Sequence, residues 1–233
     1  MTRPAVAMSE GDIRLVLDYL GNDLDPSVLI GGWATHFRVG GEISHDIDLI
    51  VTDASRYRIT DAVTDLSTTA QTDGSRKQRG DVEGVHIDIY TPHESRLGSR
   101  LQLKVENLVE HTVSLDDSKW LLLTIEAHIL TKMAAILDRH ASVKGEKDAR
   151  ELLALLQQHD DEIDPAAAAE IVLTASAVED PHDLPGLISE AFDHIRRLTP
   201  RNKENRAFLE GRERHWVAAI RTRIVAAVPR PAL

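Results

Sequence analysis

The order of apolar and polar positions predicts an N-terminal half built of alternating helices and strands. Residues 9–23 place apolar side chains at helical spacing, which predicts a first helix. Residues 28–32 form a short apolar run that ends in Gly-Gly, and residues 33–39 predict a short helix after that turn. Residues 45–52 and 85–92 alternate apolar with polar positions, as strands with one buried face do.

The rest of the chain predicts one more helix in this half and helices alone in the second half. Residues 53–66 predict a helix with Asp53 as its N-cap, and residues 72–84 a polar, turn-rich connection. Beyond Lys119 the helical spacing dominates, and it predicts helices at 120–140, 146–159, 164–177, 182–198 and 203–228. The expected fold class is therefore α+β (mixed α/β). A mixed sheet flanked by helices occupies residues 1–115, and an all-helical domain occupies residues 116–233.

Composition narrows the class of protein further. The chain has 233 residues, enough for a substantial core, and it has no cysteine, which excludes disulfides and thiolate metal sites. No apolar run approaches the length of a membrane span, and the first residues lack the apolar segment of a secretory leader. We therefore expect a cytoplasmic protein with no membrane partner.

Charge is distributed unevenly along the chain. The net charge is −11, yet residues 146–190 carry twelve acidic against two basic residues, whereas residues 191–233 carry ten basic against four acidic residues. Both segments fit ordinary solvated helix faces. The basic segment also fits a nucleic-acid surface, so the negative total does not exclude a nucleic-acid substrate.

The strand at 45–52 contains two aspartates, Asp46 and Asp48, separated by one apolar residue. Side chains at i and i+2 share a face of a strand, and two carboxylates so close repel each other unless a cation lies between them. A pair of aspartates alone fits a solvent-facing strand edge equally well. The strand at 85–92 places Asp88 on its polar face, however, and neighbouring strands would unite three carboxylates that could hold two Mg²⁺ ions.

A Gly-Gly turn precedes the aspartates by thirteen residues. Gly31 and Gly32 stand between a predicted strand and a predicted helix, where glycine permits close backbone approach and the helix start favours phosphate. Such pairs most often only make turns. Ser44, just before the aspartates, could offer its hydroxyl to a phosphate or simply end the loop.

Together these residues resemble the nucleotidyltransferase superfamily that includes DNA polymerase β, over roughly residues 28–90. That superfamily combines a Gly-Gly or Gly-Ser turn, two acids that alternate with apolar residues, and a third acid. The resemblance implies a nucleotidyltransferase-fold sheet in which three aspartates bind metal and the turn and a serine lie near the triphosphate of an NTP. The implied metal ligands are Asp46, Asp48 and Asp88, and the implied triphosphate contacts are Gly31, Gly32 and Ser44.

The helical half resembles the AbiEii/MenT nucleotidyltransferase toxins of bacterial toxin–antitoxin systems. Their second signature is a helical lysine, then an arginine, then a Lys-Asp pair that opens the next helix; here these are Lys132, Arg139, Lys147 and Asp148. Lys132 and Arg139 also lie on one stripe of an otherwise apolar helix, and a buried cation needs an anionic partner. The resemblance implies that the helical domain contributes Lys132 and Asp148 to the cleft, with Arg139 near the nucleotide.

The leading functional interpretation is Mg²⁺-dependent transfer of an NMP from an NTP to a hydroxyl acceptor. In it Asp88 is a metal ligand or the general base, and Lys132 neutralises phosphates. The resemblance to the toxins implies the tRNA 3′ end as acceptor and a cognate antitoxin as partner. Three alternatives stay open: transfer to a small molecule such as an aminoglycoside, transfer to a protein, and a non-catalytic regulator that binds nucleotide.

Overall fold

The computed structural model describes residues 9–71, 73–115, 119–200 and 202–227. Residues 1–8, on which the expected lack of a secretory leader partly depends, lie outside this range. Residues 116–118 at the predicted domain boundary also lie outside it, as do Arg201 and Arg230 of the basic segment. The chain divides into two compact units. We call Met1–Ser95 with Thr112–Leu122 the sheet unit, and Arg96–His111 with Leu123–Leu233 the helical unit.

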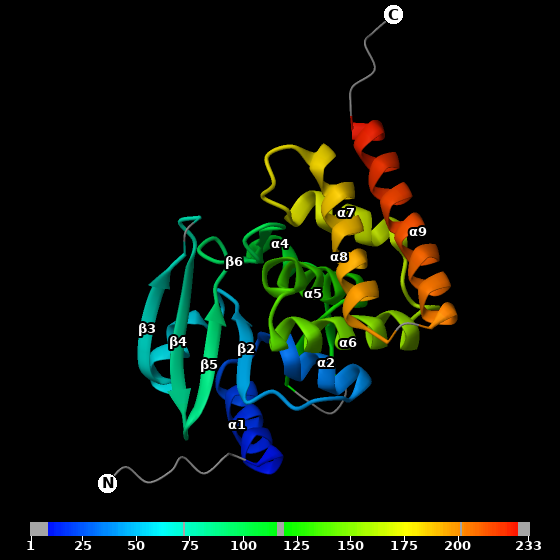
Figure 1. Cartoon of the computed structure of the whole chain (residues 1–233). Helices are drawn as coiled ribbons and strands as arrows, with labels where there is room; N and C mark the ends of the chain where they lie inside the picture. Colours follow the sequence, from blue (N-terminus) through cyan, green and yellow to red (C-terminus); the bar gives the residue numbers. More distant parts are fainter. Residues whose placement is uncertain (1–8, 72, 116–118, 201, 228–233) are drawn as a thin grey trace, which may run out of the picture. The chain divides into compact units, whose positions relative to one another are not determined.

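The sheet unit contains a mixed sheet of strand order β3-β4-β5-β2-β1-β9-β8. Strands β3, β4, β5 and β2 of this sheet are labelled in Figure 1. Strand β2 runs parallel to β5, and β1 runs parallel to β9, whereas the β1–β2, β3–β4 and β4–β5 pairs are antiparallel. The strands are β1 (Ser27–Ile30), β2 (Asp46–Val51), β3 (Thr64–Ala70), β4 (Arg76–Val82), β5 (Val85–Tyr90), β8 (Thr112–Ser114) and β9 (Leu121–Leu123).

Short helices and the sheet share one apolar core in this unit. Helix α1 begins after Ser9, whose side chain accepts from the Asp12 backbone N–H while the Asp12 carboxylate accepts from the Ser9 backbone N–H. The core unites one stripe of α1 with Trp33 and with Ile47, Leu49 and Ile87, all fully buried or nearly so. The helices are α1 (Glu10–Asp23), α2 (Gly31–Val39), α3 (Ile59–Ala62) and a 3-10 turn, η1 (Arg56–Arg58).

Two sequence predictions for this unit were wrong in part. The segment 53–66 forms only η1 and the single turn α3, and strand β3 begins at Thr64. The segment 72–84 is mostly strand β4, which pairs with both β3 and β5. Strand β3 is exposed along nearly its whole length, so it lacks the apolar alternation that marks a half-buried strand. Backbone pairing rather than side-chain burial places both segments in the sheet.

The helical unit is built of helices around a second core and has one short hairpin. Each of the predicted helices of this unit ends within a few residues of its predicted end. Helix α5 begins later than predicted, because residues 121–123 form β9. Side-chain caps fix the starts of α5, α6 and α7 at Thr124, Ser142 and Asp164. The elements are α4 (Val105–Leu108), α5 (Ile125–Arg139), α6 (Val143–Gln158), α7 (Pro165–Ala175), η2 (Pro181–Asp183), α8 (Leu184–Leu198), α9 (Lys203–Ala227), β6 (Arg96–Leu97) and β7 (Leu103–Lys104).

The mixed sheet with helices and the separate helical unit confirm the predicted fold class. The predicted division at residues 115 and 116 differs from the observed units. The chain leaves the sheet unit after Ser95, returns to it for Thr112–Leu122 and leaves it again. Among the described residues, no helix is both long and apolar enough to cross a membrane.

Candidate active site

Strand β2 presents Asp46 and Asp48 on one face. Both aspartates are half-buried, whereas Ile47 and Leu49, which alternate with them, are fully buried in the core of the sheet unit. The alternation therefore fixes the direction of both carboxylates, because turning them inward would expose two apolar side chains. This arrangement is the one that the sequence pattern predicted for these two residues.

The Gly31 turn packs directly against Asp48. Ile30, the last residue of β1, is the Cα partner of Asp48, and Gly31 follows with a φ of +68°. A Cβ added at Gly31 would lie 2.3 Å from Asp48 Oδ2, far inside van der Waals contact. Glycine is thus required here for two reasons, the left-handed backbone and the approach of the carboxylate. Gly32 is buried in the first turn of α2.

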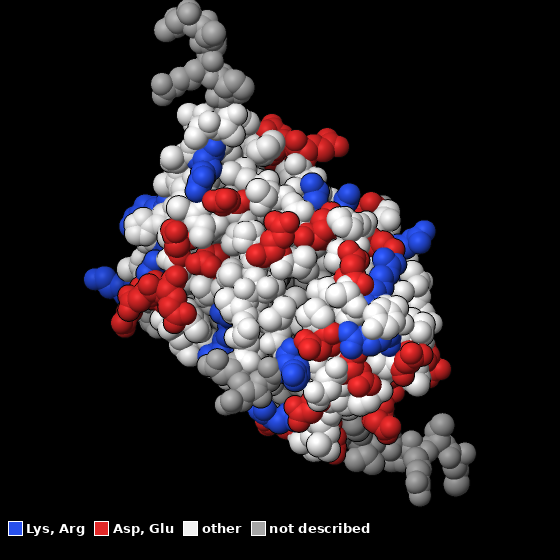
Figure 2. Space-filling model, turned by 180° about the vertical axis from the view of Figure 1, so that it is seen from behind, with Lys and Arg blue, Asp and Glu red and all other residues white. Residues whose placement is uncertain are grey.

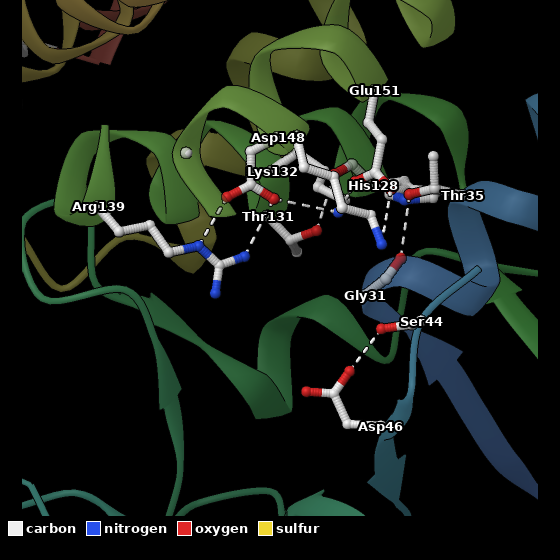
Figure 3. Close-up of polar contacts among 12 residues, drawn as sticks. Gly31, Thr35, Ser44, Asp46, His128, Thr131, Lys132, Arg139, Asp148 and Glu151 are labelled. Atoms are coloured by element: carbon white, nitrogen blue, oxygen red, sulfur yellow. Dashed lines mark hydrogen bonds and ion pairs between the residues drawn. The ribbon is translucent and has the colours of Figure 1, made fainter. Parts of the chain in front are cut away.

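Ser44 is tied to Asp46 in the same unit. Its hydroxyl donates to Asp46 Oδ1 at 2.5 Å, as Figure 3 shows, and its carbonyl accepts from Trp33 Nε1 at 3.0 Å. Trp33 is fully buried, so this bond anchors the loop before β2 to the core. In this conformation the Ser44 hydroxyl orients a carboxylate, where the sequence analysis expected a phosphate contact.

Asp88 lies beside Asp48 on the adjacent strand. Parallel pairing of β2 with β5 makes the two residues Cα partners, so Asp88 is on the neighbouring strand that the sequence analysis required. Its carboxylate accepts from Lys77 Nζ at 2.8 Å, and from Arg79 Nε at 2.7 Å and Nη2 at 2.9 Å. Within the described part of the chain, no group of three or more acidic or histidine side chains is arranged to hold a metal ion.

The ion pairs set the charge of Asp88. Its side chain is 8% exposed, and burial by itself raises the pKa of a carboxyl. The hydrogen bonds and charges of Arg79 and Lys77 outweigh the burial, and they hold the pKa of Asp88 below its usual range. Asp88 is therefore ionised near neutral pH, with two cations bound to it.

Sequence reasoning missed Lys77 and Arg79, because it assigned their segment to a turn-rich connection. They occupy β4 at positions i and i+2, so they share the face that carries Asp88. The signal that could have revealed them is this spacing of two basic residues directly before a strand with an aspartate.

In the helical unit, Lys132 is enclosed by carboxylates. Its Nζ donates to Asp148 Oδ1 at 3.3 Å and to Glu151 Oε2, and its side chain is only 6% exposed (Figure 3). Two buried acids thus neutralise one buried lysine. Sequence reasoning found Lys132 and Asp148 but missed Glu151, although it stands one helical turn after Asp148 and therefore on the same face of α6.

Arg139 lies at the other side of Asp148. Its Nε donates to Asp148 Oδ2 at 2.6 Å and its Nη2 to Oδ1 at 3.0 Å, while its side chain is 43% exposed. Lys147 Nζ is 3.7 Å from Glu151 Oε1. Asp148 therefore binds both Lys132 and Arg139. The contact of these residues with a nucleotide stays a prediction.

Two hollows of the surface are lined by residues other than the three aspartates. One, of about 550 Å³, lies at the junction of α8 and α9, and its charged lining includes Arg196, Arg197, Lys203 and Arg206 with Asp193. The other, of about 610 Å³, lies between α1 and β4 and has an acidic rim.

Basic and acidic side chains are interspersed on the face shown in Figure 2. The acidic and basic segments of the sequence therefore do not form a uniformly charged patch on that face.

Comparisons with known proteins find distant structural similarity only. No protein-family profile matches the sequence, and no curated protein matches it. A nucleotidyltransferase-like antigenic protein from Paracoccidioides brasiliensis aligns with a TM-score of 0.41 at 15% identity, over 66% of this chain and 79% of its own. A protein from Thermotoga maritima assigned as a nucleotidyltransferase aligns with a TM-score of 0.42 at 16% identity, over 65% and 98%. The structure of ANT(2")-Ia in complex with adenylyl-2"-tobramycin aligns with a TM-score of 0.40 at 14% identity, over 91% and 96%.

Proposed function

We propose that this protein is a divalent-metal-dependent nucleotidyltransferase that moves an NMP from an NTP to a hydroxyl group. The observation that carries the proposal is the position of Asp46 and Asp48. They share one face of β2, and Gly31 packs against Asp48 at a strand-to-helix turn. Two carboxylates and a glycine turn that admits phosphate are the elements that such a transfer needs.

The donor groups of the site fit a hard divalent cation such as Mg²⁺. Asp46 and Asp48 supply carboxylate oxygens from one rigid strand, and Mg²⁺ commonly takes one or two carboxylates together with substrate phosphates. When bound, such an ion would lower the pKa of the attacking hydroxyl and stabilise the negative charge of the leaving pyrophosphate.

The reaction consists of one displacement at phosphorus. The acceptor oxygen forms a bond to the α-phosphorus, and the bond from that phosphorus to the α–β bridging oxygen breaks. Pyrophosphate leaves, and the hydroxyl proton is lost to water. In this scheme the backbone at Gly31 and Gly32 lies beside the triphosphate, and Ser44 holds Asp46 in its orientation. A contribution of Lys132, Arg139 and Asp148 to phosphate binding follows from the family resemblance and stays a prediction.

The proposed acceptor is the 3′ end of tRNA, and the proposed role is that of a toxin restrained by an antitoxin. The support for this finer assignment is the resemblance of Lys132, Arg139, Lys147 and Asp148 to the second signature of the AbiEii/MenT toxins. The basic residues of α8 and α9 are compatible with an RNA acceptor.

The test is incorporation of each α-labelled NTP into total tRNA in the presence of Mg²⁺. We expect label from one nucleotide with the unaltered protein, and none with Asp46→Asn. Asp53→Asn is the matched control, since Asp53 is an exposed aspartate of the same unit. Failure of the unaltered protein to label tRNA with any nucleotide would refute the tRNA assignment. Transfer that survives in Asp46→Asn would refute the catalytic site.

A further inference from the structure

Strand β4 carries two cations on the face where the aspartates lie. Arg79 is the Cα partner of Asp88 in the antiparallel β4–β5 pair, and Lys77 lies two residues before it on the same face. Both bind the Asp88 carboxylate, at 2.7 to 2.9 Å. These three residues together carry one net positive charge, because the two cations exceed the one carboxylate.

Asp88 orients the guanidinium of Arg79 but does not cover it. The carboxylate binds the edge formed by Nε and Nη2, which leaves the N–H groups of Nη1 outside this contact. The Arg79 side chain is 56% exposed, whereas that of Asp88 is 8% exposed. A buried carboxylate thus holds an exposed, planar donor group in a fixed direction, which suits it to bind an oxyanion.

The strand order separates these cations from the Gly31 turn. In the sequence β4-β5-β2-β1, the turn follows β1, Asp46 and Asp48 lie on β2, and Lys77 and Arg79 lie on β4. The metal-binding carboxylates are therefore between the glycine turn and the cations. If the NTP phosphates lie at the glycine turn, the acceptor approaches the α-phosphate from the opposite side of the metal-binding carboxylates. Lys77 and Arg79 lie on that side.

We propose that Lys77 and Arg79 form a phosphate-binding pair for the acceptor, with Asp88 as their positioning residue. This inference rests on the proposed nucleotidyl transfer and specifies the acceptor: its reacting hydroxyl lies next to a phosphate, as at an RNA 3′ end. A cationic acceptor such as an aminoglycoside would be repelled by the two positive side chains at this position. In this arrangement Asp88 binds Lys77 and Arg79 and is not a metal ligand, and Asp46 and Asp48 are the metal ligands.

The first test measures binding without chemistry. The probe is a fluorescein-labelled single-stranded oligoribonucleotide, and its dissociation constant is obtained by fluorescence anisotropy at several salt concentrations. Loss of one charge-assisted contact predicts about tenfold weaker binding for Arg79→Gln. The slope of log K against log salt should also fall by about 0.7. Arg76→Gln is the matched control, because Arg76 is exposed on the same strand but faces the other way.

The second test separates the acceptor side from the nucleotide side. Arg79→Gln and Lys77→Gln should leave the dissociation constant of the NTP unchanged while they raise the KM for the oligoribonucleotide. Arg79→Lys keeps the positive charge but loses the planar guanidinium group. Its KM for the oligoribonucleotide should lie between that of the unaltered protein and that of Arg79→Gln. Weaker NTP binding in these variants, with oligoribonucleotide binding unchanged, would overturn the proposal, and so would no effect on either ligand.

Asp88→Asn tests the positioning role. We expect weaker oligoribonucleotide binding, with Mn²⁺ binding to the protein, measured by electron paramagnetic resonance, the same as in the unaltered chain. Loss of a Mn²⁺ ion in this variant would make Asp88 a metal ligand and overturn its assignment. These tests also separate failure of the acceptor-binding proposal from failure of the proposed function. If the proposed function is wrong, the unaltered protein transfers no nucleotide, but the anisotropy measurement still shows whether Lys77 and Arg79 bind the oligoribonucleotide.

Discussion

Asp48 and Asp88 are Cα partners across two parallel strands, yet their side chains have different surroundings. Asp48 lies against the backbone of Gly31, and Asp88 is bound by Lys77 and Arg79. Adjacent carboxylates repel, and the cations of β4 relieve that repulsion from one side. The pair therefore consists of one carboxylate suited to a metal and one that is already neutralised by the protein.

Substitution of Asp48 should remove metal binding without unfolding the protein. Asp48→Asn keeps the size of the side chain but loses the charge that a divalent cation needs. We expect turnover to fall by about a thousandfold, the rate equivalent of several kcal/mol of lost charge stabilisation. Mn²⁺ titration followed by electron paramagnetic resonance measures the binding directly, and Asp53→Asn serves as control. Unchanged Mn²⁺ affinity in Asp48→Asn would show that the metal lies elsewhere.

Substitution of Gly31 should damage the site more than the fold. Gly31→Ala strains a left-handed backbone by about 1–2 kcal/mol and forces its Cβ against Asp48 Oδ2. Gly74→Ala is the matched control, because Gly74 has a φ of +80° and nothing within 4 Å of an added Cβ. Urea denaturation should show a loss of stability from backbone strain in both variants, and a somewhat larger loss in Gly31→Ala because its Cβ also meets Asp48. Nucleotidyl transfer should fall at least tenfold for Gly31→Ala alone, and equal transfer rates would contradict the role of this contact.

Substitution of Lys132 should destabilise the helical unit. Lys132→Ala leaves Asp148 and Glu151 buried with less compensating charge. Breaking a buried ion pair by removing one partner costs about 3–5 kcal/mol. The free energy of unfolding in urea measures this loss. Lys144→Ala, which removes an exposed lysine from α6, should change that free energy by about 0.5 kcal/mol or less. A small effect of Lys132→Ala on stability would mean that its charge is not required for folding.

The ion pairs of Asp88 should make the free energy of unfolding depend on pH in the acidic range. The pKa of Asp88 is lowered in the folded protein, since the hydrogen bonds from Arg79 and Lys77 outweigh the effect of burial. Their stabilisation is therefore fully present above the ordinary carboxyl pKa of about 3.9, and it is lost as the pH falls through the lower folded-state value. The difference in unfolding free energy between the unaltered protein and Asp88→Asn should shrink in this range. A difference that stays constant with pH would contradict the ion pairs.

The sequence by itself determined the features that depend on local spacing. Alternation of apolar and polar residues fixed the faces of β2 and β5, and with them the directions of Asp46, Asp48 and Asp88. Helical spacing located the helices of the C-terminal half. These features follow from the period of a strand or a helix, which any short stretch of sequence carries.

Only the tertiary structure decided which charged groups meet. Strands β3 and β4 have little apolar alternation, and their place in the sheet depends on backbone hydrogen bonds to partners distant in sequence. The pairing of β4 with β5 brings Arg79 to Asp88, and the packing of α5 against α6 brings Lys132 to Glu151. An ionic contact depends on the distance between two side chains, and that distance is set by the fold and not by the local pattern.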